Sequence, residues 1–291
     1  MPVSVFAPAK VNLFLHVGAP RADGRHPLTS VAVFADVGDE LWLAPGHMQL
    51  RVRGPFADSL LGDARAGTNL VTQALEALGV AADVTLEKRL PIASGIGGGS
   101  ADAAAAMRAA NAVFGLRLTD EMLEARAAAL GADAPVCVRC RPAFMTGGGE
   151  VLAPAIVPSL HAVLVNPGVA MATAAVYRRF DEMGAGRLLG AQAPPRWDRP
   201  EQAILALGAL RNDLEAPACS LAPEIGAALA RLREDRFTRL ARMSGSGSTC
   251  FALVDDADAA ATLARALGRE RPTWWVRATT LGAIDAAPRA L

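Results

Sequence analysis

The sequence has no excess of charge of either sign: lysine plus arginine and aspartate plus glutamate number 29 each, so the formal net charge is zero. This balance gives no bulk electrostatic attraction to nucleic acid or to an anionic membrane. It also lacks any apolar run of roughly 18 residues, the length that a membrane helix needs. Residues 1–17 have no basic region, and Lys10 divides their apolar stretch, which argues against a signal peptide. We therefore expect a cytoplasmic protein without nucleic-acid or membrane partners, in which any bound anion is held by a local site.

Cysteine is scarce, with four residues in the chain: Cys137, Cys140, Cys219 and Cys250. The spacing of Cys137 and Cys140 matches half of a zinc knuckle or a redox pair, but no second pair and no histidine cluster accompanies it. We expect reduced, structural thiols, since a free cysteine behaves as a small hydrophobic side chain. A zinc or redox protein built on this pair stays as an alternative.

The chain is long enough for two domains, and 52% hydrophobic residues supply a packed core for each. The first half mixes predicted strands with helices, and the boundary is expected near residues 155–170, giving domains 1–157 and 158–291. Predicted strands cover 11–17, 30–37, 40–44, 48–54 and 82–91, and predicted helices cover 68–79, 100–114 and 119–130. In the second half, a helix at 173–183 is followed by a loop at 184–200 and a helix at 223–235. A βαβ pattern then follows, with a strand at 250–254, a helix at 256–270 and a strand at 274–280.

A glycine cluster, Gly95 to Ser100 with isoleucine at 96, lies between the strand ending at Pro91 and the alanine-rich helix. Four glycines in these six positions indicate backbone geometry or a close approach that a Cβ would forbid. A glycine-rich turn at a helix N-terminus presents unpaired N–H groups at the positive end of the helix dipole, where phosphate binds without a basic side chain. A flexible hinge or tight helix packing is the plainer alternative.

Two common phosphate loops do not match this cluster. The Walker pattern needs a lysine after its last glycine, whereas Ser100 and Ala101 follow Gly99. The dinucleotide pattern fails as well, because Ser100 stands where its third glycine belongs and no clear acidic residue follows about 20 positions on.

The stretch from Pro91 to Ala104 resembles the ATP-phosphate motif of the GHMP kinases. "APAKVNLFLHV" at residues 7–17 and "MSGSGSTCFAL" at 243–253 resemble the first and third motifs of that superfamily. The resemblance implies a two-domain α+β fold with the active site in the inter-domain cleft, and ATP as phosphoryl donor. It places the nucleotide at Pro91, Gly95, Ile96, Gly97, Gly98, Gly99, Ser100 and Ala101, with Asn69 and Lys88 as further contacts. For Asn69 and Lys88 a helix cap and a solvated charge pair remain alternatives.

The resemblance also assigns the reacting groups. By their sequence context alone, Asp133 in "GADAPV" reads as a turn or capping aspartate and Lys10 as a snorkelling strand residue. By resemblance, Asp133 matches the catalytic base and Lys10 its cationic partner, which stabilises the developing alkoxide. The nucleotide donor implies Mg²⁺. The sequence offers no obvious carboxylate ligand for this ion, and Ser100 is a candidate contributor.

Within the superfamily, the "RADGRH", "LGADAPVCV" and "LRNDLE" segments are similar to those of members that phosphorylate a cytidine-diphosphate-linked alcohol. That similarity implies a small-molecule substrate contacted by Asn12, His26, Thr173 and Tyr177, the single tyrosine of the chain. Arg25 departs from the pattern, which usually has tyrosine there. Core packing for Tyr177 and a structural role for His26 remain alternatives.

Two other functions stay open at this point. One is a GHMP kinase with another alcohol acceptor, such as homoserine or a mevalonate-like compound. The other is a non-catalytic nucleotide-binding regulator that has kept the fold. The sequence does not decide the oligomeric state.

Overall fold

A computed structural model of the chain describes residues 1–22, 24–60, 69–184, 186 and 193–291. Its central feature is a long antiparallel hairpin of β1 (Val3–Val17) and β2 (Leu28–Pro45). The predicted strands 30–37 and 40–44 are one strand, contrary to the expectation of a break between them. Gly38 explains this, because a Cβ there would lie 2.3 Å from the backbone oxygen of Ala7. The glycine lets the two strands pass closely instead of forming a turn.

The hairpin organises the whole sheet, since β2 pairs with different strands along its length. Its first part pairs with β5 (Ala143–Thr146), its middle with β10 (Trp275–Gly282) and its last part with β4 (Ala82–Glu87). The remaining strands are β3 (Gln49–Arg53), β6 (Val151–Pro154), β7 (Leu160–Asn166), β8 (Leu240–Met243), β9 (Cys250–Val254) and β11 (Arg289–Ala290). The sheet order β11-β1-β2-β10-β7-β9-β8 therefore joins both halves of the chain.

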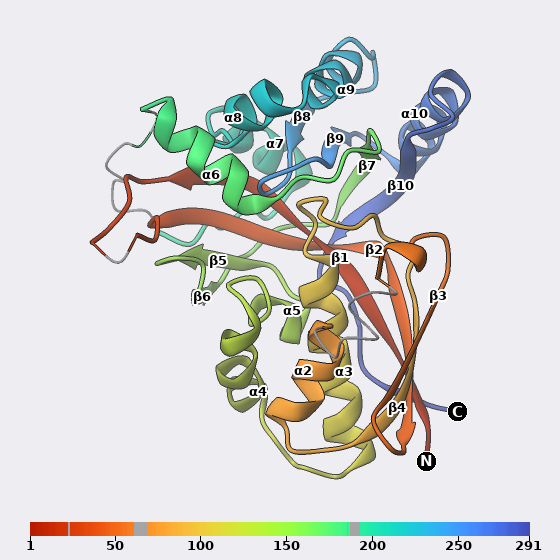
Figure 1. The fold of residues 1–291 in the computed structure, drawn as a ribbon. Helices are drawn as coiled ribbons and strands as arrows, with labels where there is room; N and C mark the ends of the chain where they lie inside the picture. The colour runs from red at the N-terminus through yellow and green to blue at the C-terminus, as the bar shows by residue number, and fades with distance from the viewer. Residues whose placement is uncertain (23, 61–68, 185, 187–192) are drawn as a thin grey trace.

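Helices pack on both sides of the hairpin (Figure 1). On the lower side in that view lie α2 (Leu70–Ala77), α3 (Gly98–Val113), α4 (Asp120–Ala127) and α5 (Val136–Arg139). On the upper side lie α6 (Thr173–Glu182), α7 (Pro200–Gly208), α8 (Glu215–Leu221), α9 (Pro223–Arg233) and α10 (Ala257–Glu270). Two 3₁₀ turns cover Asp58–Leu60 and Ala128–Leu130. Each group of helices has a buried apolar cluster of its own, and a third cluster lies between them along β1, β2 and β7.

The βαβ pattern expected in the second half is present in a split form. Both β9 and β10 pair antiparallel with β7, one on each side, so they run in the same direction with β7 between them and α10 connecting them. In the predicted loop 184–200, residues 185 and 187–192 lie outside the described residues. Short elements escaped prediction, among them β5, β6, β11, α5, α7 and α8, as did the buried strand β7.

The division at residues 157 and 158 stays a prediction. The first apolar cluster draws mainly on residues 3–145 and the second mainly on residues 163–267. Pairing of β10 with β2 and of β11 with β1 returns the end of the chain to its first half. Within the described part of the chain, no helix has the length and apolarity needed to cross a membrane.

Candidate active site

The ends of both helical layers meet at a cleft of about 1280 Å³, and β1 forms its floor. Register shifts against β2, between Pro8 and Lys10 and between Asn12 and Phe14, bracket the segment that faces this cleft. Lys10 and Asn12 are two positions apart and so point to the same side of the strand. The backbone N–H of Lys10 donates to the carbonyl of Ile96, at 2.9 Å, which attaches β1 to the glycine cluster.

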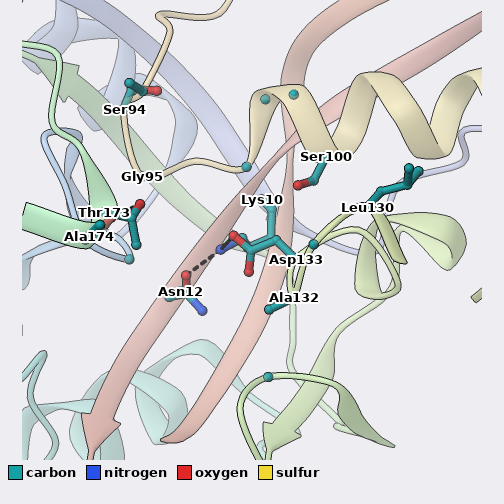
Figure 2. A pocket seen from close by; sticks show the side chains of 18 of the residues that line it. Lys10, Asn12, Ser94, Gly95, Ser100, Leu130, Ala132, Asp133, Thr173 and Ala174 are labelled. Atoms are coloured by element: carbon teal, nitrogen blue, oxygen red, sulfur yellow. Dashed lines mark hydrogen bonds and ion pairs between the residues drawn. The ribbon is translucent and has the colours of Figure 1, made fainter. Parts of the chain in front are cut away.

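Lys10 is the centre of a small polar network (Figure 2). Its Nζ lies 2.9 Å from Oδ2 of Asp133 and donates to Oδ1 of Asn12 at 2.6 Å. Asn12 Nδ2 donates in turn to the hydroxyl of Ser30 at 2.7 Å. The Lys10 side chain is 2% exposed and that of Asp133 is 40% exposed. The ammonium is thus fixed in place, while the carboxylate is open to the cleft.

The glycine cluster forms the turn that begins α3, two residues before the predicted start. Gly97 is the N-cap with φ 63° and no side-chain cap, and Gly95 has φ 74°. A Cβ on Gly97 would lie 3.1 Å from Cε of Lys10, and one on Gly95 would lie 2.4 Å from the carbonyl oxygen of Ser244. Both positions therefore need glycine for conformation and for space. The first-turn N–H groups of α3 open beside the Lys10–Asp133 pair, where the helix dipole favours an anion.

Residues 243–249, within the segment that resembles the third superfamily motif, form hydrogen bonds with this turn and with β1. Ser244 Oγ accepts from the N–H of Asn12 at 3.1 Å and donates to the carbonyl of Gly95 at 2.9 Å. Asn212, from the "LRNDLE" segment, donates to the carbonyls of Met243 and Gly245, each at 2.8 Å. The three sequence motifs thus meet at one place.

Lys88 is held in a buried ion cluster on the wall of the cleft. Its Nζ contacts Oδ2 of Asp39 at 2.5 Å and Oδ2 of Asp102 at 2.7 Å, and all three side chains are at most 3% exposed. Burial disfavours the ammonium, but the two carboxylates outweigh it and raise the pKa of Lys88 overall. Burial also raises the pKa of Asp102 well above its ordinary value. The alternative that Lys88 belongs to a solvated charge pair is therefore wrong, because the ammonium and both of its carboxylate partners are buried.

The remaining predicted nucleotide contacts divide into two groups. Pro91, Gly98, Gly99, Ser100 and Asn69 line the cleft. Asn69 also caps α2, because its Oδ1 accepts from the N–H of Val71 at 2.9 Å. The side chains of Ile96 and Ala101 are buried in the core. The carbonyl of Ile96 accepts from Lys10, and the N–H of Ala101 donates to the carbonyl of Gly97, so both residues shape the turn through their backbone.

The predicted acceptor contacts lie along α6 and at the far end of the hairpin. Thr173 Oγ1 lies 3.0 Å from the hydroxyl of Ser246, which belongs to residues 243–249. The rings of Tyr177 and His26 are 5.0 Å apart between centroids. Burial, together with the charge of Asp133, raises the pKa of Tyr177 to about 12. Arg25 also lines this end of the cleft.

The cysteine pair lies in the core behind the site. Cys137 and Cys140 are free thiols on and just after α5, and Cys140 Sγ contacts the carbonyl of Cys137 at 3.2 Å. Burial raises the pKa of both thiols. Across the described residues, no group of three or more histidine, cysteine, aspartate or glutamate side chains is arranged to hold a metal ion.

Several cleft residues were not predicted from sequence: Asp102, Glu150, Asp181 and Ser246. Ser246 belonged to a recognised segment, and the signal for Asp102 was its position two residues after Ser100. For Asp181 the available signal was its spacing of four from Tyr177, which places both on one face of a helix. Glu150 follows three glycines, a run that has no helix directly after it and so gave no phosphate-loop pattern.

Comparison with known sequences identifies the family. The GHMP kinases N terminal domain matches residues 69–141, and the GHMP kinases C terminal domain matches residues 180–272. Together they cover more than half of the chain. The chain belongs to the GHMP kinases, and the expected two-domain α+β fold of this superfamily is confirmed.

Close relatives narrow the family further. The 4-diphosphocytidyl-2-C-methyl-D-erythritol kinase of Caulobacter vibrioides (strain NA1000 / CB15N) is 48% identical over 95% of this chain and 98% of its own. That of Roseobacter denitrificans is 45% identical over 99% and 97%. A crystal structure of 4-(cytidine 5'-diphospho)-2C-methyl-D-erythritol kinase, 35% identical, superposes with a TM-score of 0.76 over 97% of this chain and 100% of the other. Within the GHMP kinases, the chain belongs to the 4-diphosphocytidyl-2-C-methyl-D-erythritol kinase family, a family of phosphotransferases.

A more distant likeness concerns the fold alone. The L. major mevalonate kinase, solved with R-mevalonate, has a TM-score of 0.68 and 17% identity over 97% of this chain and 96% of its own.

Proposed function

We propose that this chain transfers the γ-phosphoryl group of ATP to the 2-hydroxyl of 4-diphosphocytidyl-2-C-methyl-D-erythritol, giving the 2-phosphate and ADP. This reaction belongs to the non-mevalonate route to isoprenoid precursors. The observation that carries the proposal is the Lys10–Asp133 pair, 2.9 Å apart, beside the glycine-rich start of α3 in one cleft.

Asp133 accepts the proton of the acceptor hydroxyl as the oxygen–phosphorus bond forms and the bond to the β-phosphate oxygen breaks. Its side chain is the more exposed member of the pair, so the acceptor can reach it. Lys10 stabilises the negative charge that develops on the acceptor oxygen. Asn12 holds the ammonium in position through its 2.6 Å contact with Nζ.

The donor phosphates lie against the backbone N–H groups of residues 95–100, with Asn69, Lys88 and Pro91 around the rest of the nucleotide. Ala101 supports this turn, because its N–H donates to the carbonyl of Gly97 at 2.8 Å. A magnesium ion fits as a partner that arrives with the nucleotide, because the cleft residues that the structure describes offer isolated oxygen ligands instead of a complete set. Ser100 is the protein ligand we assign to it, and Oδ1 of Asp102, buried without a hydrogen-bond partner, lies on the same turn of α3. Bound there, the ion would supply positive charge against the donor phosphates.

The acceptor is a small molecule that lies along α6, with Asn12 and Thr173 near its reacting end and His26 and Tyr177 near its base. Thr173 and Tyr177 are one helical turn apart, so they present side chains to the same side of the cleft. Residues 1–157 and 158–291 form the two domains whose junction is this cleft. We place the reaction in the cytoplasm, where ATP is available.

The test is ADP release with Mg-ATP and 4-diphosphocytidyl-2-C-methyl-D-erythritol, run in parallel with mevalonate and homoserine. We expect turnover with the cytidyl compound alone. Turnover with another alcohol would retain the kinase and overturn the acceptor, and no turnover with any acceptor would overturn the reaction.

A further inference from the structure

A buried carboxylate on β2, that of Asp39, lies behind the glycine-rich turn and has no part in the proposed reaction. Its side chain is 0% exposed, and Asp39 is not among the described residues that line the cleft. Burying a charge is unfavourable unless the charge is paired and hydrogen-bonded. The partners of this carboxylate therefore indicate what it does.

Pairing of β2 with β4 brings Asp39 to the stem of the glycine-rich turn, which is residues 88–90. Glu40 pairs with Glu87, the last residue of β4. The two strands are antiparallel, so the next position on each places Asp39 opposite Lys88. The carboxylate thus lies where the chain leaves the sheet and enters the stem.

Both oxygens of Asp39 are bound to the stem. Oδ1 accepts from the backbone N–H of Arg89 at 2.6 Å and from that of Leu90 at 2.9 Å. Oδ2 contacts Nζ of Lys88 at 2.5 Å. One side chain therefore fixes the path of the backbone and the position of the ammonium together.

The ammonium that Asp39 holds lies against the glycine-rich turn itself. A Cβ on Gly98 would lie 3.1 Å from Nζ of Lys88. The same Nζ donates to Oδ2 of Asp102, at 2.7 Å, in the first turn of α3. A displacement of this cation would therefore displace the start of α3, whose N–H groups we assign to the donor phosphates.

We infer that Asp39 is a positioning residue for the donor nucleotide: it holds Lys88 and the stem so that the N–H groups of the glycine-rich turn are arranged for phosphate. It does so without contacting the nucleotide. The inference rests on the proposed function, since that function supplies the nucleotide. Because coupling between binding and conformation is reciprocal, nucleotide binding must in turn stabilise the hydrogen bonds that Asp39 accepts.

Asparagine has the size of aspartate but cannot make the same contacts. A carboxylate accepts on both oxygens, whereas an amide accepts on its oxygen and donates from its NH₂. In Asp39→Asn the NH₂ faces either the Lys88 ammonium or the two backbone N–H groups, and all of these are donors. The stem and the cation can no longer both be held.

Asp36→Asn is the matched control. Asp36 lies on the same strand, three residues earlier, and its Oδ1 accepts from the backbone N–H of Thr280 at 3.0 Å. It is likewise absent from the described lining of the cleft. The control therefore makes the same chemical change at a carboxylate that binds backbone N–H groups away from the stem.

The first test measures the Kd of two ligands separately by isothermal titration calorimetry, for the full chain and both variants. The ligands are the non-hydrolysable ATP analogue AMP-PNP with Mg²⁺, and 4-diphosphocytidyl-2-C-methyl-D-erythritol. Thermal melting identifies a temperature at which each variant is folded. A small misplacement of a positioned group can cost about a hundredfold, so Asp39→Asn should weaken AMP-PNP binding at least about tenfold. The Kd of the cytidyl alcohol should be unchanged, and Asp36→Asn should match the full chain for both ligands.

A purely structural role would lower the folded fraction and so reduce binding of both ligands together. An equal loss for the two ligands, or an unaltered Kd for AMP-PNP in folded Asp39→Asn, overturns the inference.

The second test needs no variant at Asp39 and so does not depend on how well Asp39→Asn folds. Amide hydrogen exchange of the full chain is followed by NMR at Arg89 and Leu90, with the N–H of Thr280 as the control. Addition of AMP-PNP with Mg²⁺ should slow exchange at Arg89 and Leu90 and leave Thr280 unchanged. Unchanged exchange at Arg89 and Leu90 in the nucleotide-bound protein overturns the inference.

The two proposals fail in different ways. Nucleotide binding that depends on Asp39, combined with no phosphorylation of the cytidyl alcohol, overturns the proposed reaction and leaves the positioning role standing. Phosphorylation of that alcohol, combined with parent-like nucleotide binding by Asp39→Asn, overturns the positioning role alone.

Discussion

Lys10 and Asp133 form an ion pair of 2.9 Å although one lies in the first strand and the other in the turn before α5. Each is held by a different part of the fold. A double irregularity in β1 aims Lys10 into the cleft, and the segment between the 3₁₀ turn at Ala128–Leu130 and α5 carries Asp133. Lys10 and Asp133 therefore come together only when the β1–β2 hairpin and the helical layer that contains α3 and α5 are both in place.

Replacing Asp133 by asparagine should lower kcat by about a hundredfold to ten-thousandfold, the usual contribution of a general base. The KM for ATP should change little, because the donor phosphates contact the loop of α3. Steady-state kinetics on the purified variant measure both quantities. Lys10→Met should reduce kcat to a similar extent, and a kcat near the parent value in either variant would contradict the assignment.

Replacing Gly97 by alanine should raise the KM for ATP at least tenfold. The new Cβ would lie 3.1 Å from Cε of Lys10, at a position with φ 63°. Gly115→Ala is the matched control, since Gly115 follows the same helix with φ 61°, and a Cβ added there would have no neighbouring atom within 4 Å. The control should cost about 1 kcal/mol of stability through backbone strain alone and leave the KM unchanged. Equal KM values for the two variants would show that strain, not the site, causes the effect.

In the buried ion cluster, replacing Lys88 by an uncharged residue should lower the free energy of unfolding more than replacing Asp102 does. Lys88→Met leaves Asp39 and Asp102 buried without their cation, which should cost about 3–5 kcal/mol in the free energy of unfolding. Asp102→Asn should cost much less, because burial already raises the pKa of that carboxyl and favours its neutral form. Urea unfolding followed by circular dichroism measures both. Equal destabilisation by the two substitutions would argue against this distribution of charge.

The sign of the pH effect follows from the raised pKa of Asp102. A carboxyl of this kind contributes stability below its ordinary value of 3.8, and that contribution is lost as the pH rises towards its folded value. Asp102→Asn removes this loss of stability, because an amide does not ionise as the pH rises. The stability of the variant relative to the parent should therefore be more favourable at neutral pH than at pH 3.8.

Tyr177 provides a direct spectroscopic test, because it is the only tyrosine in the chain. Its pKa is raised to about 12 from an ordinary 10.0, so the phenol stays neutral over this interval in the folded protein. The stability that the neutral phenol contributes is present below pH 10.0 and is lost as the pH rises towards 12. Alkaline titration of the phenolate absorbance measures the value. A midpoint near 10.0 in the folded protein would contradict the burial of the ring beside Asp133.

The sequence predicted the glycine-rich turn and the helix after it, because these depend on local patterns. Lys10 and Asp133 were singled out by resemblance to the superfamily's motifs; the structure brings them together, and their roles stay a prediction. It did not predict the continuous strand through Gly38, since a glycine followed by aspartate has the composition of a turn. The close pass over Ala7 that decides the matter is a long-range contact. Asp39 likewise gave no signal as a partner of Lys88, because the two are brought together only by pairing of β2 with β4.

The acceptor end illustrates a different limit. Asp181 has no motif around it, and its relation to His26 depends on how α6 packs against the loop between β1 and β2. Sequence spacing relates Asp181 to Tyr177 but does not predict its contact with His26. Short buried strands and helices such as β7 and α8 gave no periodic pattern long enough to distinguish them.

The most direct measurement of the central claim is the position of the new phosphate on the product. Wild-type protein, Mg-ATP and 4-diphosphocytidyl-2-C-methyl-D-erythritol are incubated together, with Asp133→Asn as the control, and the product is analysed by phosphorus and carbon NMR. The account predicts a phosphomonoester on the 2-hydroxyl, coupled to C2, and about a hundredth or less of that yield from the variant in the same time. A phosphate at any other hydroxyl, or an undiminished yield from Asp133→Asn, would contradict it.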